Sequence, residues 1–347
     1  MDTAQFNEAL AHIRRFETML VEDGALILKF WLHLSKKEQY KRLKKLEKNP
    51  HTRRSVSKRD WRHAKLYDQF VKTAEQAIRQ TDSGEAPWLL VEATDWRYRD
   101  LTVARTVLES LAKHLSLESA QSEITTQSKP LTPTGTLPST LTILDTVDLS
   151  QCLRAQEYSQ ALETYQGQLH RLAWAAYEQK CSTIIVFEGW DAGGKGGAIR
   201  RMTQAMDARL YRVISTAAPT DEERVHHYLW RFWRHIPRAG RVTIYDRSWY
   251  GRVLVERVEG FAKEKEWQRA YLEINDFEEQ FAKHGNVVIK FWIHVSQDEQ
   301  LRRFQEREKI PYKKHKITDE DWRNREKWDV ADLLVKKMAQ LPEQTKN

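Results

Sequence analysis

Short apolar runs alternate with longer segments of helical periodicity along most of this chain. The apolar runs are rich in β-branched and aromatic residues, which predicts strands at 25–34, 88–93, 183–189, 241–246 and 286–295. The segments between them repeat apolar residues every three to four positions, as amphipathic helices do. Because strands and helices alternate, the pattern predicts an α/β fold, a doubly wound parallel sheet with helices on both faces.

The periodic segments predict a series of helices. In 1–23, the first of them, the apolar residues at helical spacing are Phe6, Leu10, Ile13, Phe16 and Leu20. An acidic first turn after Ala217-Ala218-Pro219-Thr220 predicts a further helix start. The charged segment from Lys36 to Lys58 is expected to form one or two exposed helices around Pro50, and the remaining predicted helices cover 60–79, 101–115, 156–179 and 198–206.

The strand at 183–189 runs straight into Gly189-Trp190-Asp191-Ala192-Gly193-Gly194-Lys195-Gly196-Gly197, which precedes a predicted helix. A strand, a Gly-rich turn and a helix in this order are the context of a phosphate loop. The glycines allow backbone N–H groups to face an anion, the helix N-terminus adds partial positive charge, and Lys195 adds a full charge. Gly196 stands where Ser or Thr usually follows, so Asp191 is the expected magnesium ligand inside the loop.

A second candidate centre lies at the end of the strand 241–246. Its last residue, Asp246, is where a P-loop fold places the carboxylate that holds magnesium, directly or through water. Arg247 follows and can brace phosphoryl oxygens with two N–H groups. We therefore expect Asp191, Lys195, Asp246 and Arg247 to form the catalytic centre, with the two aspartates as metal ligands.

The loop 189–197 resembles the phosphate loop of the polyphosphate kinase 2 family, Gly-x-Asp-Ala-x-Gly-Lys-Gly-Gly. Asp246-Arg247 and the following Ser248-Trp249-Tyr250-Gly251-Arg252 match the second motif of that family. The resemblance implies a P-loop kinase fold and phosphoryl transfer between inorganic polyphosphate and nucleotides with Mg²⁺ as cofactor. Gly251 resembles the class that uses AMP, so the implied reaction moves a phosphoryl group from polyphosphate to AMP and gives ADP.

The resemblance also implies binding roles for residues around these motifs. A basic segment from Arg302 to Lys316 follows the strand 286–295, where nucleotide-kinase folds carry a lid that closes over the phosphates. The residues implied to hold phosphate are Gly189, Gly193, Gly194, Gly196, Gly197, Arg200, Lys313, Lys316 and Arg323. Those implied to face the nucleotide are Pro219, Thr220, Tyr250, Gly251 and Arg252.

An internal repeat relates the two halves of the chain. Lys29–Ser35 recurs as Lys290–Ser296 at an offset of 261, and Asp60–Arg62 recurs as Asp321–Arg323 without a gap. This predicts a duplicated domain whose first copy begins after its phosphate loop. We also expect the strand 25–34 to pair with 88–93, which leaves 286–295 at an open sheet edge where the chain could self-associate.

The repeat and the composition together predict three parts. Residues 1–115 are the C-terminal half of a degenerate kinase-like copy, and the Ser-, Thr- and Pro-rich 116–150 is a linker. Residues 151–347 form the P-loop kinase domain, expected to lack its last strand and helix. By this interpretation the chain is a two-copy member of the family cut at both ends.

The composition narrows the possible partners. A net charge of +8 indicates a polyanion but does not distinguish nucleic acid from polyphosphate, and the resemblance favours polyphosphate with AMP or ADP and no nucleic acid. A mean hydropathy of −0.71 argues against a membrane span or partner. Two cysteines and no secretory leader fit the cytoplasm.

Two alternatives to the implied activity stay open at this stage. One is an ATP-dependent nucleoside or nucleotide kinase of the same fold, against which Gly196 and the basic lid argue. The other is a catalytically impaired remnant that binds polyphosphate or forms homo-oligomers. The sequence leaves the nucleotide acceptor, its base, the direction of transfer and the oligomeric state undecided.

Overall fold

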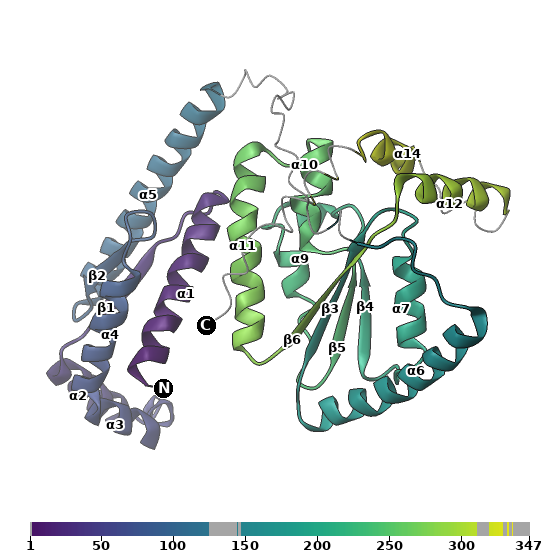
Figure 1. Ribbon diagram of the computed structural model, residues 1–347. Helices are drawn as coiled ribbons and strands as arrows, with labels where there is room; N and C mark the ends of the chain where they lie inside the picture. The colour runs from purple at the N-terminus through teal and green to yellow at the C-terminus, as the bar shows by residue number, and fades with distance from the viewer. Residues whose placement is uncertain are drawn as a thin grey trace. The chain divides into compact units, whose positions relative to one another are not determined.

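The computed structural model describes residues 2–124, 144, 147–310, 319–328, 332 and 335. It divides into two compact units, unit 1 (Met1–Gly135) and unit 2 (Thr136–Asn347). Each unit has its own parallel sheet (Figure 1). The fold is therefore α/β, as the alternating pattern predicts.

The sheet of unit 2 carries the phosphate loop. Its four parallel strands lie in the order β4-β5-β3-β6, with bounds β3 Thr183–Gly189, β4 Tyr211–Ser215, β5 Val242–Asp246 and β6 Val287–Ile293. The central strand β3 places Phe187 beside Asp246 of β5 and Phe291 of β6. The carboxyl ends of the strands therefore meet at one edge, where doubly wound sheets bind their ligands.

Helices cover both faces of this sheet in Figure 1. On one face, α6 (Ala155–Glu178) and α7 (Lys195–Thr203) bury a cluster that includes Ile185, Phe187 and Ile244. Burial of such side chains stabilises the fold by about 1.5–3 kcal/mol each. The other helices of unit 2 are α8 (Asp221–Arg224), α9 (Trp230–Trp233), α10 (Val255–Glu259), α11 (Glu264–Lys283), α12 (Gln297–Lys309) and α14 (Asp319–Glu326), with the 3₁₀ turn η3 (Trp249–Arg252).

An aromatic cluster packs the region between β5 and α11. Trp249 is fully buried and meets Phe277 edge to face, with ring centroids 5.0 Å apart. Phe232 and Tyr245 pack against the same indole. Several of the many tryptophans and phenylalanines are therefore packing residues, as expected for rings that each bury a large apolar area.

Unit 1 pairs its own two strands, as the sequence analysis predicts. Strand β1 (Lys29–His33) runs parallel to β2 (Trp88–Glu92), with Lys29 opposite Trp88. Among the described strands, β6 pairs only with β3 and has an open outer edge. The helices of unit 1 are α1 (Thr3–Glu22), α2 (Lys36–Lys48), α3 (Lys58–Lys65), α4 (Tyr67–Thr81) and α5 (Trp96–Ile124), with the 3₁₀ turn η1 (Arg53–Ser55).

The internal repeat holds at the level of elements. Adding 261 to the bounds of α1, α2 and α3 gives those of α11, α12 and α14. One ion pair repeats as well: Lys29 to Glu17 and Lys290 to Glu278 both measure 2.7 Å. In both units, therefore, the same ion pair connects a helix to the strand that follows it.

Several predicted elements were wrong in detail. Strand β4 was not predicted, because its sequence Tyr-Arg-Val-Ile-Ser is short and mixes polar with apolar residues. The helix predicted at 60–79 is two helices that break at Leu66, and the one predicted at 101–115 extends over Trp96–Ile124. Helix α7 begins at Lys195 instead of Ala198, because the phosphate loop passes directly into the first helical turn.

Candidate functional site

The phosphate loop leaves β3 in a conformation that requires glycine. Gly189 has a φ of 132°, and a Cβ there would lie 2.2 Å from the carbonyl oxygen of Ile293. Gly194 has a φ of 116° and precedes the first turn of α7. The glycines therefore allow the loop to lie against β6 and to turn into a helix N-terminus, where backbone N–H groups favour an anion.

Lys195 folds back over the loop that it follows. Its Nζ donates hydrogen bonds to the carbonyl oxygens of Gly189 (2.6 Å) and Trp190 (3.1 Å). Burial lowers the pKa of Lys195, and the negative charge of Asp191 opposes that shift. The cation is thus held at the mouth of the loop in a poorly solvated place, where its field on an anion is strong.

Three elements meet at the Asp191 carboxylate. One carboxylate oxygen accepts a hydrogen bond from Arg247 at 2.7 Å, and the other accepts one from Asn324 of α14 at 2.9 Å. Burial by itself raises the pKa of the Asp191 carboxyl, but the charges of Arg247 and Lys195 outweigh it and the net pKa is lowered. Asp191 is therefore ionised at neutral pH, as a ligand for a cation must be.

Arg247 itself adopts an unusual backbone. Its φ is 65°, in the left-handed region that residues other than glycine rarely occupy. Its N–H donates to the carbonyl oxygen of Phe187 at 3.0 Å, which fixes the turn after β5. Strained backbone of this kind persists where the surroundings hold it in place, and it directs the guanidinium into the loop.

Asp246 ends β5 directly beside the end of β3. Its negative charge raises the pKa of Lys195, although less than Asp191 does. Within the described residues no hydrogen bond or ion pair is formed by its carboxylate, while its backbone oxygen accepts from the N–H of Thr216 at 3.0 Å. The carboxylate therefore keeps its oxygens available at the strand ends.

Glu188 is a site residue that the sequence analysis missed. It precedes Gly189 at the end of β3 and accepts hydrogen bonds from both the N–H and the hydroxyl of Ser248, each at 2.7 Å. Burial raises the pKa of Glu188. A charged residue inside an otherwise apolar strand was the signal that could have identified it.

Two side chains of helix α12 donate hydrogen bonds to the backbone of the phosphate loop. The Gln300 side chain is 2% exposed and donates from Nε2 to the backbone oxygen of Asp191 at 3.0 Å. Arg303 donates from Nη1 to the carbonyl oxygens of Ala192 (3.0 Å) and Gly193 (2.8 Å). The predicted lid segment thus begins with a helix that is bonded to the loop.

The neighbouring arginine has a different environment. Arg302 pairs with Glu299 and Glu306 on its own helix. Hydrogen bonds from Arg302 and Arg303 hold the pKa of Glu299 at about 2. Of these two adjacent arginines, only Arg303 is bonded to the phosphate loop in the described structure.

Aromatic rings pack against Trp190 of the loop. Trp190 lies on Trp328, with ring centroids 3.9 Å apart and planes at 19°, and meets Trp292 edge to face. Its indole N–H donates to Nδ1 of His294 at 3.1 Å. These contacts fix the residue before Asp191 and therefore the position of the carboxylate.

The structure separates the residues implied to face the nucleotide. Tyr250 donates to Glu278 at 2.8 Å, and burial raises its pKa. Arg252 pairs with Glu256 at 2.7 Å and lies over the Tyr228 ring. These two side chains are engaged in the body of unit 2, and no described bond joins them to the phosphate loop.

The other residues implied to face the nucleotide, Pro219, Thr220 and Gly251, are half-buried or exposed. Thr220 caps α8 by accepting from the N–H of Glu223 at 3.2 Å, directly after Pro219. A Cβ added to Gly251 would meet nothing within 4 Å. The hydroxyl of Thr216, ahead of these residues, donates to the backbone oxygen of Arg247 at 2.9 Å and ties this segment to the site.

The phosphate-side cations are only partly described. Arg200 on α7 and Arg323 on α14 are exposed, and neither side chain forms an ion pair with a described residue. Lys313 and Lys316 lie outside the described residues. Their implied role in holding polyphosphate stays a prediction.

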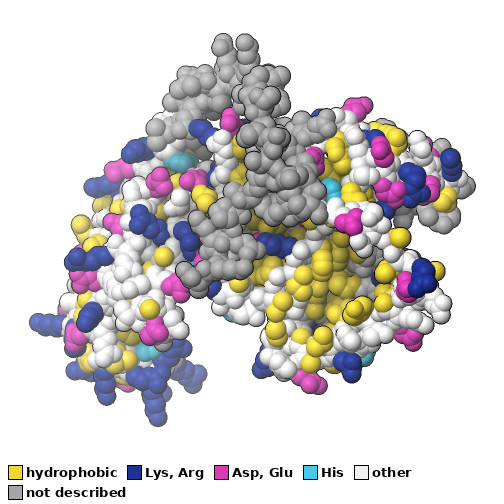
Figure 2. All heavy atoms as spheres, in the orientation of Figure 1, with side chains coloured by type: hydrophobic (Ala, Val, Ile, Leu, Met, Phe, Trp, Pro, Cys, Tyr) yellow, Lys and Arg dark blue, Asp and Glu magenta, His cyan; other side chains and the backbone are white. Residues whose placement is uncertain are grey.

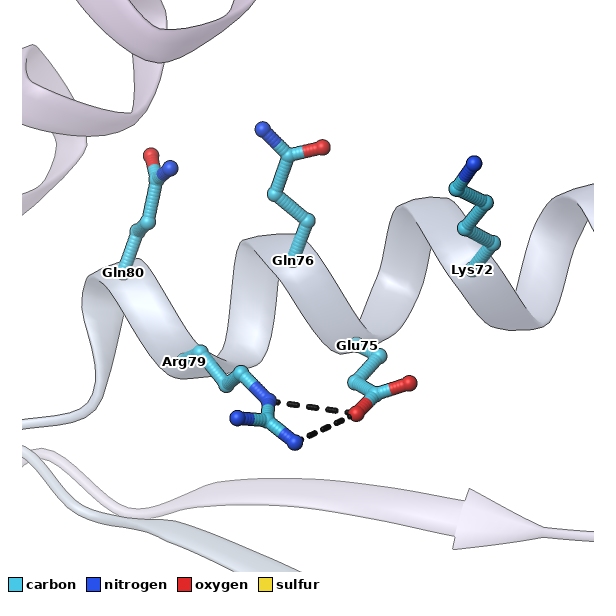
Figure 3. Close-up of a pocket in the computed structure, with 5 residues that line it drawn as sticks. All are labelled: Lys72, Glu75, Gln76, Arg79 and Gln80. Atoms are coloured by element: carbon cyan, nitrogen blue, oxygen red, sulfur yellow. Dashed lines mark hydrogen bonds and ion pairs between the residues drawn. The ribbon is translucent and has the colours of Figure 1, made fainter.

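A hollow on unit 1 does not belong to this site. It is lined by residues of α4, including Lys72, Gln76 and an ion pair between Arg79 and Glu75 of 2.7 Å (Figure 3). All of its lining residues come from one helix, and none is a candidate site residue. The chemistry lies at the phosphate loop.

The donor set at the loop suits magnesium. Within the described residues there is no group of three or more His, Cys, Asp and Glu side chains that could enclose a metal ion. Magnesium is usually bound by one or two carboxylates together with substrate phosphates, and Asp191 and Asp246 offer two. The residues therefore fit Mg²⁺ as an ion shared with the substrate.

A scan of family models matches "Polyphosphate kinase 2 (PPK2)" over residues 1–118 and 152–345. A protein of Pseudomonas aeruginosa named polyphosphate:AMP phosphotransferase is 49% identical over 343 residues, which cover 97% of this chain and 68% of that protein. A protein of the same name from Acinetobacter johnsonii is 38% identical and covers 96% of this chain and 67% of its own length.

A crystal structure described as a polyphosphate kinase 2 from Pseudomonas aeruginosa superimposes with a TM-score of 0.79 and 44% identity. That match covers 97% of this chain and 65% of the other. The chain thus spans about two thirds of the length of these relatives.

Among the described helices, none has the length and apolar character to cross a membrane. The matched residues include the phosphate loop, the second motif and both copies of the internal repeat, and the chain belongs to the polyphosphate kinase 2 family.

Proposed function

We propose that this chain transfers a phosphoryl group from inorganic polyphosphate to AMP and forms ADP. The observation that carries the proposal is the Asp191 carboxylate, held by Arg247 at 2.7 Å beside a phosphate loop closed by Lys195. A lysine and an arginine beside a glycine-rich loop at a helix N-terminus support binding of phosphate oxygens. The names of the curated relatives, polyphosphate:AMP phosphotransferase, indicate which phosphates.

The reaction needs no nucleophilic side chain. A phosphate oxygen of AMP attacks the terminal phosphorus of polyphosphate, the bond to the bridging oxygen breaks, and the shortened polyphosphate leaves with that electron pair. The attacking oxygen is already ionised at neutral pH, so no general base is required. Lys195 and Arg247 supply positive charge where negative charge develops, which is the main contribution a kinase site makes.

Magnesium completes this charge balance in the proposal. Asp191 and Asp246 would hold the ion, which would supply positive charge against the phosphate oxygens of the substrates. Asp191 is ionised because Arg247 and Lys195 lower its pKa. The two carboxylates also favour the charged form of Lys195, since each raises its pKa against the effect of burial.

The two substrates are assigned to opposite sides of the loop. We place polyphosphate along the lid side, with Arg200, Lys313, Lys316 and Arg323 as its cations and the loop glycines as backbone donors. We place AMP beside Pro219, Thr220 and Gly251, with Tyr250 and Arg252 supporting that side. Free cysteines at Cys152 and Cys181 suit a cytoplasmic location for the reaction.

The test is a panel of donors and acceptors. Purified chain is incubated with Mg²⁺, with polyphosphate or ATP as donor and with AMP, ADP or GMP as acceptor, and the products are separated by nucleotide chromatography. We expect ADP from polyphosphate and AMP. Transfer from ATP alone would favour the ATP-dependent kinase, and no transfer with retained polyphosphate binding would favour the remnant.

Two variants connect the panel to the site. Lys195→Ala and Asp246→Asn should each lower the rate of ADP formation by at least about a hundredfold, since each removes a charge that acts on the transferred group. Lys265→Ala changes an exposed lysine on α11 and serves as the control. Activity of either site variant within a few-fold of the parent would contradict the proposed roles.

A further inference from the structure

The positive charge of this chain is concentrated in one segment of unit 1. Residues 36–65, which form α2, η1 and α3, contain thirteen Lys and Arg against three Asp and Glu, a net charge of +10. The whole chain has a net charge of +8, so the rest of it is slightly negative. Twelve of the thirteen basic side chains are exposed, and Figure 2 shows them gathered over α2 and α3 at lower left. These exposed side chains are called the basic surface below.

Most of this charge is not neutralised within the protein. Lys36 pairs with Asp68 and Lys41 with Glu38. Arg42, the half-buried exception, donates to the carbonyl oxygens of Ala93 (2.6 Å) and Thr94 (2.8 Å). The other basic residues form no ion pair with any described residue; they include Lys44, Lys45, Lys48, Arg53 and Arg54.

The arrangement costs folding stability. On α2, Lys41 and Lys45 are four residues apart, as are Lys44 and Lys48. Like charges at this spacing destabilise a helix. A helix face that serves only solubility mixes both signs instead. The basic surface is therefore arranged for an anion outside the protein.

The equivalent segment of unit 2 has a much lower net charge, so the high charge is not a general property of the repeat. Residues 297–326 contain nine Lys and Arg against eight Asp and Glu, a net charge of +1. There Arg302 is paired with Glu299 and Glu306, so its charge is largely satisfied. The copy without a phosphate loop thus has the far more basic version of the same helices.

We infer that the basic surface of unit 1 is a second binding site for inorganic polyphosphate, separate from the catalytic one. The inference rests on the proposed function, which makes this polyanion the substrate. A long chain held on unit 1 stays at high effective concentration for the phosphate loop of the same molecule. The site would therefore act on long polyphosphate and leave short chains unaffected.

The aromatic residues of the segment distinguish this ligand from nucleic acid. Single-stranded nucleic acid is held by bases stacked on exposed rings. Tyr40 and Trp61 instead pack edge to face on each other, 5.8 Å apart, and both are half-buried. The segment exposes the imidazole of His51 but no Phe, Tyr or Trp ring, so the surface offers mainly charge, which suits a ligand that consists only of phosphates.

The test compares two variants of the full chain that have the same net charge. The first neutralises part of the basic surface with Lys44→Gln, Lys45→Gln, Lys48→Gln, Arg53→Gln and Arg54→Gln. The second changes five exposed basic residues that lie outside this surface and form no described ion pair: Arg105→Gln, Lys113→Gln, Arg171→Gln, Arg238→Gln and Lys265→Gln. Binding of long end-labelled polyphosphate is measured without nucleotide over a salt series.

We expect the first variant to bind at least tenfold more weakly at low salt, and the second to bind within about threefold of the parent. The slope of log Kobs against log salt should fall in magnitude by about 2–3.5 in the first variant, since each phosphate contact contributes roughly 0.7. A chain with Lys44→Arg, Lys45→Arg and Lys48→Arg, in which Arg53 and Arg54 are kept, should bind as the parent does. Equal weakening in both variants would overturn the inference, because it would show a dependence on net charge alone.

Two further arms separate this inference from the proposed function and from a nucleic-acid partner. Polyphosphate binding to the Lys195→Ala chain needs no turnover. Its affinity therefore tests the basic surface even if the parent forms no ADP. If the parent is active, the first variant should raise the KM for long polyphosphate at least fivefold and leave kcat and the KM for tripolyphosphate unchanged. Tighter binding of a single-stranded oligonucleotide of equal charge, lost in the first variant, would instead assign the surface to nucleic acid.

Discussion

The Asp191 carboxylate accepts side-chain hydrogen bonds from separate parts of unit 2. Arg247 follows β5 and Asn324 belongs to α14, yet both are bonded to the same group. Each bond to a charged partner contributes about 1.5–3 kcal/mol, and loss of one leaves a buried charge without its partner. The carboxylate therefore depends on residues more than fifty positions away in sequence.

Glu188 gives a prediction about pH. Because burial raises its pKa in the folded state, the folded protein binds more protons than the unfolded one between the ordinary value of 4.5 and the raised value. The contribution of Glu188 to stability therefore falls as pH rises through this window. Glu188→Gln keeps an oxygen for Ser248 and does not titrate, so it should be more stable than the parent at pH 7.

Denaturant unfolding of both proteins across pH 4 to 8 measures this difference. The advantage of Glu188→Gln should shrink as pH falls toward the ordinary value of 4.5. Glu163→Gln on α6, at an exposed position, is the control and should show no such trend. A variant less stable than the parent at pH 7 would show that ionised Glu188 stabilises the fold.

Arg303 and Arg302 form a matched pair for a second prediction. Arg303 donates two bonds to the phosphate loop, whereas Arg302 pairs only along its own helix. Arg303→Ala should lower kcat/KM for ADP formation by about 10–100-fold, equivalent to about 1.4–2.7 kcal/mol. Arg302→Ala should change it by less than about threefold. Similar losses for the two variants would mean that α12 acts through its net charge.

The sequence predicted the residues of this site that share one motif. Spacing within a strand, turn and helix predicted Asp191 and Lys195 in one loop, and the end of the strand 241–246 predicted Asp246 and Arg247 beside it. Gln300 and Asn324 could not be predicted, because they are more than a hundred positions from the loop and only the fold brings them to it.

At the scale of elements, the contact between the phosphate loop and β6 sets the geometry of the site. Gly189→Ala would place a Cβ 2.2 Å from the carbonyl oxygen of Ile293 at a φ of 132°, so the loop and β6 would have to separate. We expect a loss of at least about 3 kcal/mol in the free energy of unfolding. Gly251→Ala, where an added Cβ meets nothing, should change it by less than about 1 kcal/mol. Equal stability of the two variants in thermal unfolding would contradict this contact.

The sequence predicted strands well where apolar residues dominate. Strands β3, β5 and β6 are rich in apolar and β-branched residues and were found within a few residues of their bounds. Strand β4 is at the edge of the sheet, where Arg212 is exposed, so its sequence lacks the unbroken apolar run that marks a buried parallel strand. Helix ends depended on local caps and loops that periodicity does not report.

At the scale of the whole molecule, the open edge of β6 predicts self-association. Val287, Ile289 and Phe291 are 43%, 38% and 43% exposed on one side of this strand. Among the described strands β6 pairs only with β3, and a strand with one open edge and exposed apolar side chains is a template for another chain. Sedimentation should therefore show a mass that rises with concentration, and Ile289→Lys should weaken the association at least tenfold.

Leu272→Lys is the control for this prediction. Leu272 lies on α11 and is 72% exposed, so it offers the same change of an apolar side chain to a cation on a helix instead of the edge strand. It should leave the association unchanged. A parent that stays monomeric at all concentrations, or equal effects of the two variants, would exclude β6 as the contact.

The most direct test of the central claim follows a single phosphoryl group. Polyphosphate labelled in its terminal phosphate is mixed with excess enzyme, Mg²⁺ and AMP, and the label is traced over one turnover. The account predicts that the label appears in the β-phosphate of ADP, and that Lys195→Ala abolishes this transfer while the fold is retained. Label released as inorganic phosphate, or ADP formed equally by Lys195→Ala, would contradict the account.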